Sequence, residues 1–147
     1  MSQGQWLIVG YGNTLRSDDG VGYRLAEQIE AQNWPQVTVL ALPQLTPELA
    51  VPIAQVERVI FIDAHLVTSP LVAIEPLLPH SPRASFGHVG DPRQLLGWAQ
   101  WLYGRVPIAW WVKVATQNLE LGETFSPLTR QAQQEAYAKI AQLVASR

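Results

Sequence analysis

Two aspartates are the residues best placed to do chemistry in this sequence. Asp19 follows a short apolar run that stops at the turn formed by residues 10–13, and Asp63 directly follows a second apolar run, residues 59–62. In open α/β sheets, ligands bind beyond the carboxyl ends of the strands. Neighbouring parallel strands would bring the two carboxylates into one crevice, where like charges repel unless a cation or a proton lies between them. The pair therefore predicts a metal site.

A histidine would complete a mixed oxygen and nitrogen site. His88 lies in a long loop, residues 79–90, and a neutral imidazole beside two carboxylates suits a transition-metal ion. His65 is a rival, because it follows Asp63 by two residues and would lie on the same side of a continued strand. The chain contains no cysteine, which excludes thiolate ligands, disulfides and a cysteine nucleophile.

The acidic positions also have a purely structural interpretation. An aspartate at a strand end, such as Asp63, is often a turn former. Asp18 and Asp19 precede Gly20 and a helical pattern, where carboxylates cap helices and interact favourably with the helix dipole. On this reading one of the two caps the helix and the other points outward.

Other kinds of site are poorly supported. The third glycine of a dinucleotide fingerprint that begins at Gly10 would fall at Leu15, and the loop lacks the lysine and serine of a phosphate-binding loop. A nucleotide-binding module is therefore disfavoured. No G-x-S-x-G sequence is present to expose a serine nucleophile.

Composition limits the partners. The formal net charge is -2 and the 10 lysines and arginines form no basic run, which argues against nucleic acid or an anionic membrane as the main partner. Neither a signal peptide nor an apolar stretch of roughly 18 residues is found. We expect a cytoplasmic protein.

Apolar runs and helical patterns alternate along the chain. Strands are predicted at residues 6–9, 37–42, 59–62, 72–77 and 108–114, and their continuously apolar character indicates a sheet covered on both faces. A helix follows residue 20, a short one opens at Pro47, and Asp91–Pro92 and Ser126–Pro127 each begin a longer one. The helix after Asp91 has an apolar stripe and ends at Gly104; the stripe is Leu95, Leu96, Ala99, Leu102 and Tyr103. The fold class is α/β in three layers, and the 147 residues form a single domain, 1–147.

Tryptophan is unusually frequent, with six residues. Most are expected in the core or at its rim, although a groove that accepts a peptide strand would also use aromatic faces. Trp110 and Trp111 lie together on the last predicted strand.

Several segments resemble one family. Residues 10–22, Gly-Tyr-Gly-Asn-Thr-Leu-Arg-Ser-Asp-Asp-Gly-Val-Gly, closely resemble the N-terminal signature of nickel-iron hydrogenase maturation endopeptidases. Residues 60–64 are similar to the family's second acidic segment, and the loop with His88 falls where the family places its histidine. Residues 119–123, followed by Ser126–Pro127, resemble the segment before the family's last helix. Together the matches cover nearly the whole chain.

This resemblance implies a fold and an activity. The fold is a three-layer α/β/α sandwich around a five-stranded, mostly parallel mixed sheet. The activity is removal of a short C-terminal extension from the hydrogenase large-subunit precursor after nickel insertion. Asp19, Asp63 and His88 would contact the nickel carried by this nickel-loaded partner, and the enzyme would need no cofactor of its own.

The resemblance also suggests roles within the site. Asp19 or Asp63 would activate a water for hydrolysis, since no residue looks like a nucleophile for an acyl-enzyme. A supporting loop would hold them; its residues are Gly10, Gly12, Asn13, Asp18 and Gly20. Residues 44–49 and the Trp110–Trp111 strand look like the branch serving bidirectional, NAD-linked hydrogenases. The alternative is a nickel-binding hydrogenase assembly factor without a hydrolytic step.

Overall fold

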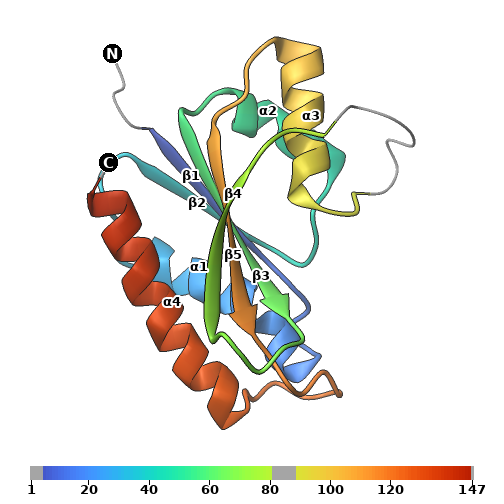
Figure 1. The fold of residues 1–147 in the computed structure, drawn as a ribbon, viewed down its shortest axis with the longest axis vertical. Coiled ribbons are helices and arrows are strands. Elements are labelled where there is room, and N and C mark those ends of the chain that lie inside the picture. Colours follow the sequence, from blue (N-terminus) through green and yellow to red (C-terminus); the bar gives the residue numbers. More distant parts are fainter. Residues whose placement is uncertain (1–4, 81–88, 147) are drawn as a thin grey trace.

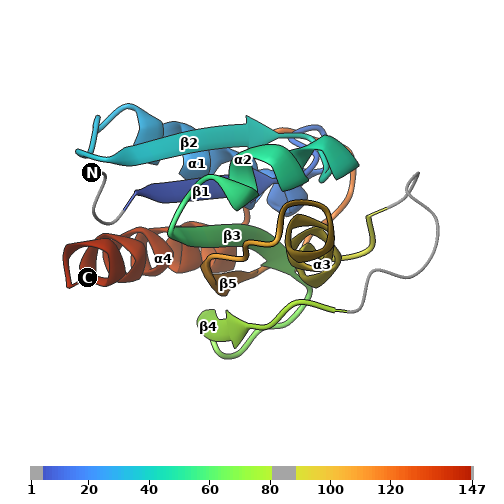
Figure 2. The same ribbon diagram turned by 90° about the horizontal axis from the view of Figure 1, so that it is seen from above.

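The strands form one mixed sheet. The computed structural model describes residues 5–80 and 89–146. The sheet contains β1 (Trp6–Tyr11), β2 (Val37–Leu42), β3 (Arg58–His65), β4 (Val72–Leu77) and β5 (Ile108–Ala115). Their spatial order is β2-β1-β3-β5-β4, as Figure 2 shows, and only β4 is antiparallel to its neighbour.

Helices cover both faces of this sheet. The helix α1 (Val21–Glu30) and the long α4 (Pro127–Ala145) lie on one face, whereas α2 (Ala50–Ala54) and α3 (Pro92–Tyr103) lie on the other (Figure 1). Short 3-10 helices, η1 (Ser17–Gly20) and η2 (Pro47–Leu49), precede α1 and α2. The predicted fold class, a three-layer α/β/α sandwich around a five-stranded, mostly parallel sheet, is confirmed.

The core is split in two by the sheet because successive strand residues point to opposite faces. On β1, Ile8 packs toward α1 and α4, whereas Leu7 and Val9 pack toward α2 and α3. Ile60 and Phe61 on β3 divide in the same way. Both faces of the central strands are therefore apolar, which explains why their sequences do not alternate with polar residues.

Local signals set the ends of two helices as predicted. Asp91 caps α3: its Oδ1 accepts a hydrogen bond from the Arg93 N–H at 2.8 Å, and the side chain of Gln94 completes a capping box. Gly104 ends the helix in the left-handed conformation, with φ of 69°. Ser126 caps α4 through its Oγ, which accepts from the Thr129 N–H at 3.3 Å.

Two expectations about the elements were wrong. The side chains of Leu102 and Tyr103 are each 50% exposed, because the last turn of α3 extends beyond the core filled by its earlier turns. Asp63 does not end its strand, since β3 continues to His65 and pairs with β5 up to Ala115.

Candidate active site

An acidic pocket lies at the carboxyl ends of β1 and β3. Its volume is about 250 Å³. The strand order makes β1 and β3 the point from which the chain winds outward in both directions, which is where doubly wound sheets bind ligands. The lining residues come from four separate segments: Tyr11, Gly12, Asp19, Pro43, Gln44, Leu45, Asp63, Val89 and Gly90. We call this the acidic pocket, and it contains both aspartates selected from the sequence.

The loop after β1 fixes the position of Asp19. The Asn13 N–H donates a hydrogen bond of 2.9 Å to Asp19 Oδ2. Gly12 has φ of 152°, and a Cβ there would lie 2.0 Å from the Asp19 carbonyl oxygen, so no other residue fits. Gly20 is also constrained, because its Cβ would lie 2.8 Å from the Thr14 Cα. These contacts give Gly12, Asn13 and Gly20 a direct role in shaping the loop.

The remaining glycines of the motif serve packing rather than phosphate binding. A Cβ on Gly10 would lie 2.0 Å from the carbonyl oxygen of Gly22, and one on Gly22 would lie 2.4 Å from that of Ile62. The absence of side chains therefore lets α1 approach β1 and β3 closely. This accounts for a glycine pattern that resembles, but does not match, a nucleotide-binding loop.

Asp63 is a carboxyl group poised to exchange a proton near neutral pH. Burial raises its pKa to about 6, and the charge of Asp19 acts in the same direction. The Tyr11 hydroxyl, as a hydrogen-bond donor, and the nearby His65 oppose this rise. A cation between the two aspartates would relieve both the repulsion and the burial of charge.

Tyr11 is a pocket residue that sequence reasoning missed. Burial is the main reason that the pKa of its hydroxyl is raised, and the adjacent Asp63 carboxylate adds to the effect. The hydroxyl therefore stays protonated and can donate to Asp63. The signal was available, because Tyr11 lies two residues after Val9 and so shares the face of β1 that α2 and α3 cover.

The neighbouring Asp18 does not cap α1, and neither does Asp19. The N-cap of α1 is Gly20, without a side-chain hydrogen bond. Asp18 is instead fully buried and accepts bonds from the backbone N–H groups of Gln117, Asn118 and Ser126 at 3.0, 2.9 and 2.7 Å. The Ser126 hydroxyl donates a fourth bond at 2.7 Å. The capping prediction was wrong because these donors lie about a hundred residues away in the sequence.

The two histidines predicted as a third ligand differ in what the structure describes of them. His65 lies close enough to lower the pKa of Asp63, but it does not line the acidic pocket. His88 lies outside the described residues, although Val89 and Gly90, which follow it in sequence, do line the pocket. Within residues 5–80 and 89–146, no group of three histidine or acidic side chains could by itself hold a metal ion.

Fold and pocket together define a doubly wound α/β protein with a paired-carboxylate site at the switch point of its sheet. No protein-family model matches the chain, and no curated protein matches it either. None of the described helices is long and apolar enough to cross a bilayer.

Solved structures with the same fold include hydrogenase maturation enzymes. The hydrogenase maturating endopeptidase HybD from Escherichia coli superposes with a TM-score of 0.75 and 21% identity, over 97% of this chain and 93% of that one. The NiFe hydrogenase maturation protease HycI from Thermococcus kodakarensis gives 0.71 and 20%, over 97% and 93%. HybD from Thermococcus kodakarensis gives 0.72 and 18%, over 95% and 99%. At these identities the likeness establishes a shared fold along nearly the whole chain.

Proposed function

We propose that this protein is an endopeptidase that removes the C-terminal extension of a nickel-iron hydrogenase large-subunit precursor, in the cytoplasm, after nickel has been inserted. The observation that carries the proposal is the pairing of Asp19 and Asp63 in one pocket at the β1 and β3 switch point. The full-length fold likeness to maturation endopeptidases supports it. The sequence similarity of residues 10–22 and 60–64 to the same family supports it independently.

In this proposal nickel arrives with the substrate. Two carboxylates that repel each other gain a shared cation when the loaded precursor docks, so the empty precursor binds less well. Specificity for the loaded form then follows from a difference in affinity. Asp19 and Asp63 supply oxygen ligands, and His88 or His65 supplies an imidazole, a donor set that suits a transition ion.

Asp63 is also the better candidate for proton transfer. Without a bound cation Asp63 has a pKa of about 6 and is largely deprotonated at neutral pH, and a bound cation would favour the charged form further. The Asp63 oxygen that does not contact nickel could then accept a proton from an attacking water. Tyr11 would hold the Asp63 carboxylate in place while the proton moves. The proton can then pass to the amine of the departing peptide.

The test is incubation of the purified protein with nickel-loaded and nickel-free precursor, followed by intact-mass measurement. We expect a shortened product from the loaded precursor only, and a loss of at least about a hundredfold in rate for Asp19→Asn and Asp63→Asn. Glu30→Gln, which changes an exposed carboxylate at the end of α1, serves as the matched control. Full processing by both aspartate variants would contradict the proposal.

Two further readouts separate the alternatives. Formation of a stable complex without any shortened product would identify a nickel-binding assembly factor instead. His88→Ala and His65→Ala, compared in the same assay, decide which histidine is the third ligand. Only the variant that lacks the true ligand should lose the preference for the nickel-loaded precursor over the nickel-free one.

A further inference from the structure

A second pocket of about 420 Å³ is lined in part by Trp111, whose side chain also lies close to Tyr11 and Asp63 of the acidic pocket. It is lined by residues 75–80 and by Arg93, Trp111 and Lys113. The ring of Trp111 belongs to this second pocket, whereas its indole N–H reaches Tyr11 and Asp63 of the acidic pocket and lowers the pKa of both. Trp111 therefore lines the second pocket and contacts the surroundings of two residues, Tyr11 and Asp63, that line the acidic pocket.

The indole nitrogen of Trp111 is buried, and no partner among the described residues meets it with full hydrogen-bond geometry. Its influence on Tyr11 and Asp63 is thus that of a nearby donor rather than of a closed hydrogen bond. An incompletely paired buried donor is uncommon in a folded protein. Here it lies at the junction of two pockets, where an occupant of either would change its surroundings.

Two cations lie over the ring of Trp111. The Lys113 Nζ is 4.4 Å from the ring centroid, and the Arg93 Cζ is 5.7 Å from it. Positive groups at these distances are held by the negative face of the indole. The second pocket therefore presents two positioned cations beside an aromatic surface.

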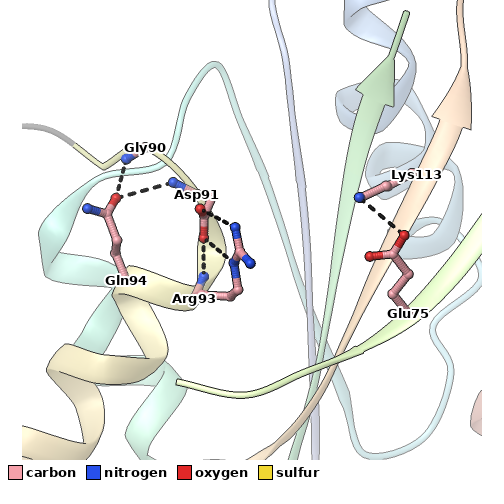
Figure 3. A network of polar contacts seen from close by, with 6 residues as sticks. All are labelled: Glu75, Gly90, Asp91, Arg93, Gln94 and Lys113. Atoms are coloured by element: carbon pink, nitrogen blue, oxygen red, sulfur yellow. Dashed lines mark hydrogen bonds and ion pairs between the residues drawn. The ribbon is translucent and has the colours of Figure 1, made fainter. Parts of the chain in front are cut away.

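Each cation already has an acidic neighbour, but the two pairs differ (Figure 3). Arg93 binds Asp91 through two side-chain hydrogen bonds, of 2.9 and 3.1 Å, within the cap of α3. Lys113 pairs with Glu75 at 3.2 Å; its own side chain is 16% exposed, whereas that of Glu75 is 50% exposed. A half-exposed carboxylate is held weakly and can be replaced by another carboxylate.

The spacing of the two pockets suits an extended peptide. Asp63 on β3 pairs in register with Lys113 on β5, and Glu75 on β4 pairs with Trp111. From β1 to β4 the sheet spans three strand intervals, or about 14 Å, which an extended chain covers in about four residues. A peptide held at Asp19 and Asp63 can therefore reach the second pocket within a few residues.

We propose that the second pocket is a substrate subsite that binds an acidic side chain of the precursor, about two to four residues from the bond cut at the acidic pocket. This inference rests on the proposed function for the identity of the occupant. The incoming carboxylate displaces Glu75 from Lys113, Arg93 adds a second positive charge, and Trp111 supports the apolar part of the side chain. The geometry thus assigns Lys113 and Trp111 to specificity.

The test uses short peptides and does not depend on cleavage. We would follow the indole N–H signal of Trp111, identified by its loss in Trp111→Phe, in nuclear magnetic resonance spectra of nitrogen-15-labelled protein. The probes are acetyl-Ala-Ala-Ala-Glu-amide and its Gln counterpart. We expect the Glu peptide to shift this signal saturably and to bind at least about fivefold more tightly than the Gln peptide.

Variants give the test a direction. Lys113→Met should abolish the preference for the Glu peptide, whereas Lys113→Arg, which keeps the positive charge, should retain it. Glu75→Gln should tighten binding of the Glu peptide, because the competing carboxylate is gone. Lys139→Met is the matched control, since Lys139 forms a 3.5 Å pair with Glu135 on α4, outside both pockets. Equal shifts from both peptides, or no change in the preference in Lys113→Met and Glu75→Gln, would overturn the proposal.

The precursor assay keeps the two proposals distinct. If the precursor is cut, Lys113→Met should raise KM for it severalfold and leave kcat unchanged. Processing with an unaltered KM, together with no peptide preference, defeats the subsite alone. A clear peptide preference with no cleavage of any precursor retains the acidic-peptide site and defeats only the proposed endopeptidase.

Discussion

Asp18 and Asp63 have identical side chains but different roles, because their surroundings shift their pKa values in opposite directions. Asp18 is buried, which by itself raises a carboxyl pKa, but the hydrogen bonds from Ser126, Gln117 and Asn118 overcome this and lower its pKa. Asp63 is half-buried with fewer donors, so its pKa rises to about 6. Asp18 therefore stays charged and structural, while Asp63 is free to exchange a proton.

The environment of Asp63 predicts that removing its charge stabilises the protein. The pKa is about 6 in the folded protein, against an ordinary value of 3.8 for an aspartate, so the folded state binds the extra proton and loses stability as pH rises through this window. Asp63→Asn should therefore raise the free energy of unfolding at pH 8 by up to about 3 kcal/mol. Thermal unfolding of both proteins between pH 4 and 8 measures the difference.

The gain should become small near pH 4, where the folded carboxyl is protonated and the unfolded one, with its ordinary pKa of 3.8, is only partly ionised. Glu30→Gln, on the exposed end of α1, should show no such pH-dependent gain. A destabilised Asp63→Asn at pH 8 would contradict the assignment of burial as the dominant influence.

At the scale of elements, the loop after β1 is tied to the segment between β5 and α4. Besides the bonds to Asp18, the Ser17 N–H donates to the Gly122 carbonyl at 2.8 Å, and the Gly122 N–H donates to the Leu15 carbonyl at 2.9 Å. The Ser17 hydroxyl donates to the Glu120 carbonyl at 2.7 Å. We call this set of contacts the loop clamp. It fixes the segment that carries Asp19.

Asp18→Asn should weaken the loop clamp. An amide NH₂ group would face N–H donors that now meet a carboxylate, so we expect a loss of roughly 2–4 kcal/mol in the free energy of unfolding. Ser126→Ala, which removes only the hydroxyl donor and the cap of α4, should cost about 1 kcal/mol. Urea denaturation monitored by circular dichroism compares the two. Equal, small losses would show that the buried charge contributes little.

Replacing a glycine with alanine should lower stability by very different amounts at Gly10 and at Gly104. Gly10→Ala places a methyl group 2.0 Å from the Gly22 carbonyl oxygen, which forces α1 away from β1. Gly104→Ala adds a methyl group with nothing within 4 Å, and only the left-handed backbone with φ of 69° is unfavourable. The second change should cost about 1 kcal/mol and the first several times more, measured by thermal unfolding. A mild Gly10→Ala would show that α1 can shift freely.

Sequence reasoning succeeded where the controlling interactions are local. The five strands and the caps at Asp91 and Ser126 follow from runs of a few residues, and so does the meeting of Asp19 and Asp63 in one pocket, although β3 runs two residues beyond Asp63. It failed for Asp18, whose partners are the distant Gln117, Asn118 and Ser126, because no local pattern reports a contact across a hundred residues. The contact of Lys113 with Trp111 was missed although it is local, since the two residues are separated by one position and share a face of β5. Arg93 comes from the separate helix α3.

At the scale of the whole molecule, the carboxyl groups with altered pKa values predict that the free energy of unfolding is greatest at acidic pH. Asp18 and Asp91 have lowered pKa values, so their contribution is present above about pH 4 and is lost as pH falls through their folded-state values. Asp63 contributes below about pH 4, and its contribution is lost as pH rises through 6. Together these groups place the maximum near pH 4 to 5.

A series of unfolding curves between pH 2 and 9 checks this expectation. In Asp63→Asn the decline from pH 4 to 6 should vanish, whereas the fall below pH 4 should remain. A wild-type maximum at pH 8 would show that other groups control the balance.

The loop clamp also affects the order in which parts of the protein become structured during synthesis. A ribosome makes residues 10–22 long before residues 117–126, so the loop that carries Asp19 cannot be locked while the nascent chain is still short. The sheet can begin to assemble from β1, β2 and β3, yet the acidic pocket acquires its rigid wall only after β5 has entered between β3 and β4. Competence for chemistry is therefore one of the last properties that the growing chain acquires.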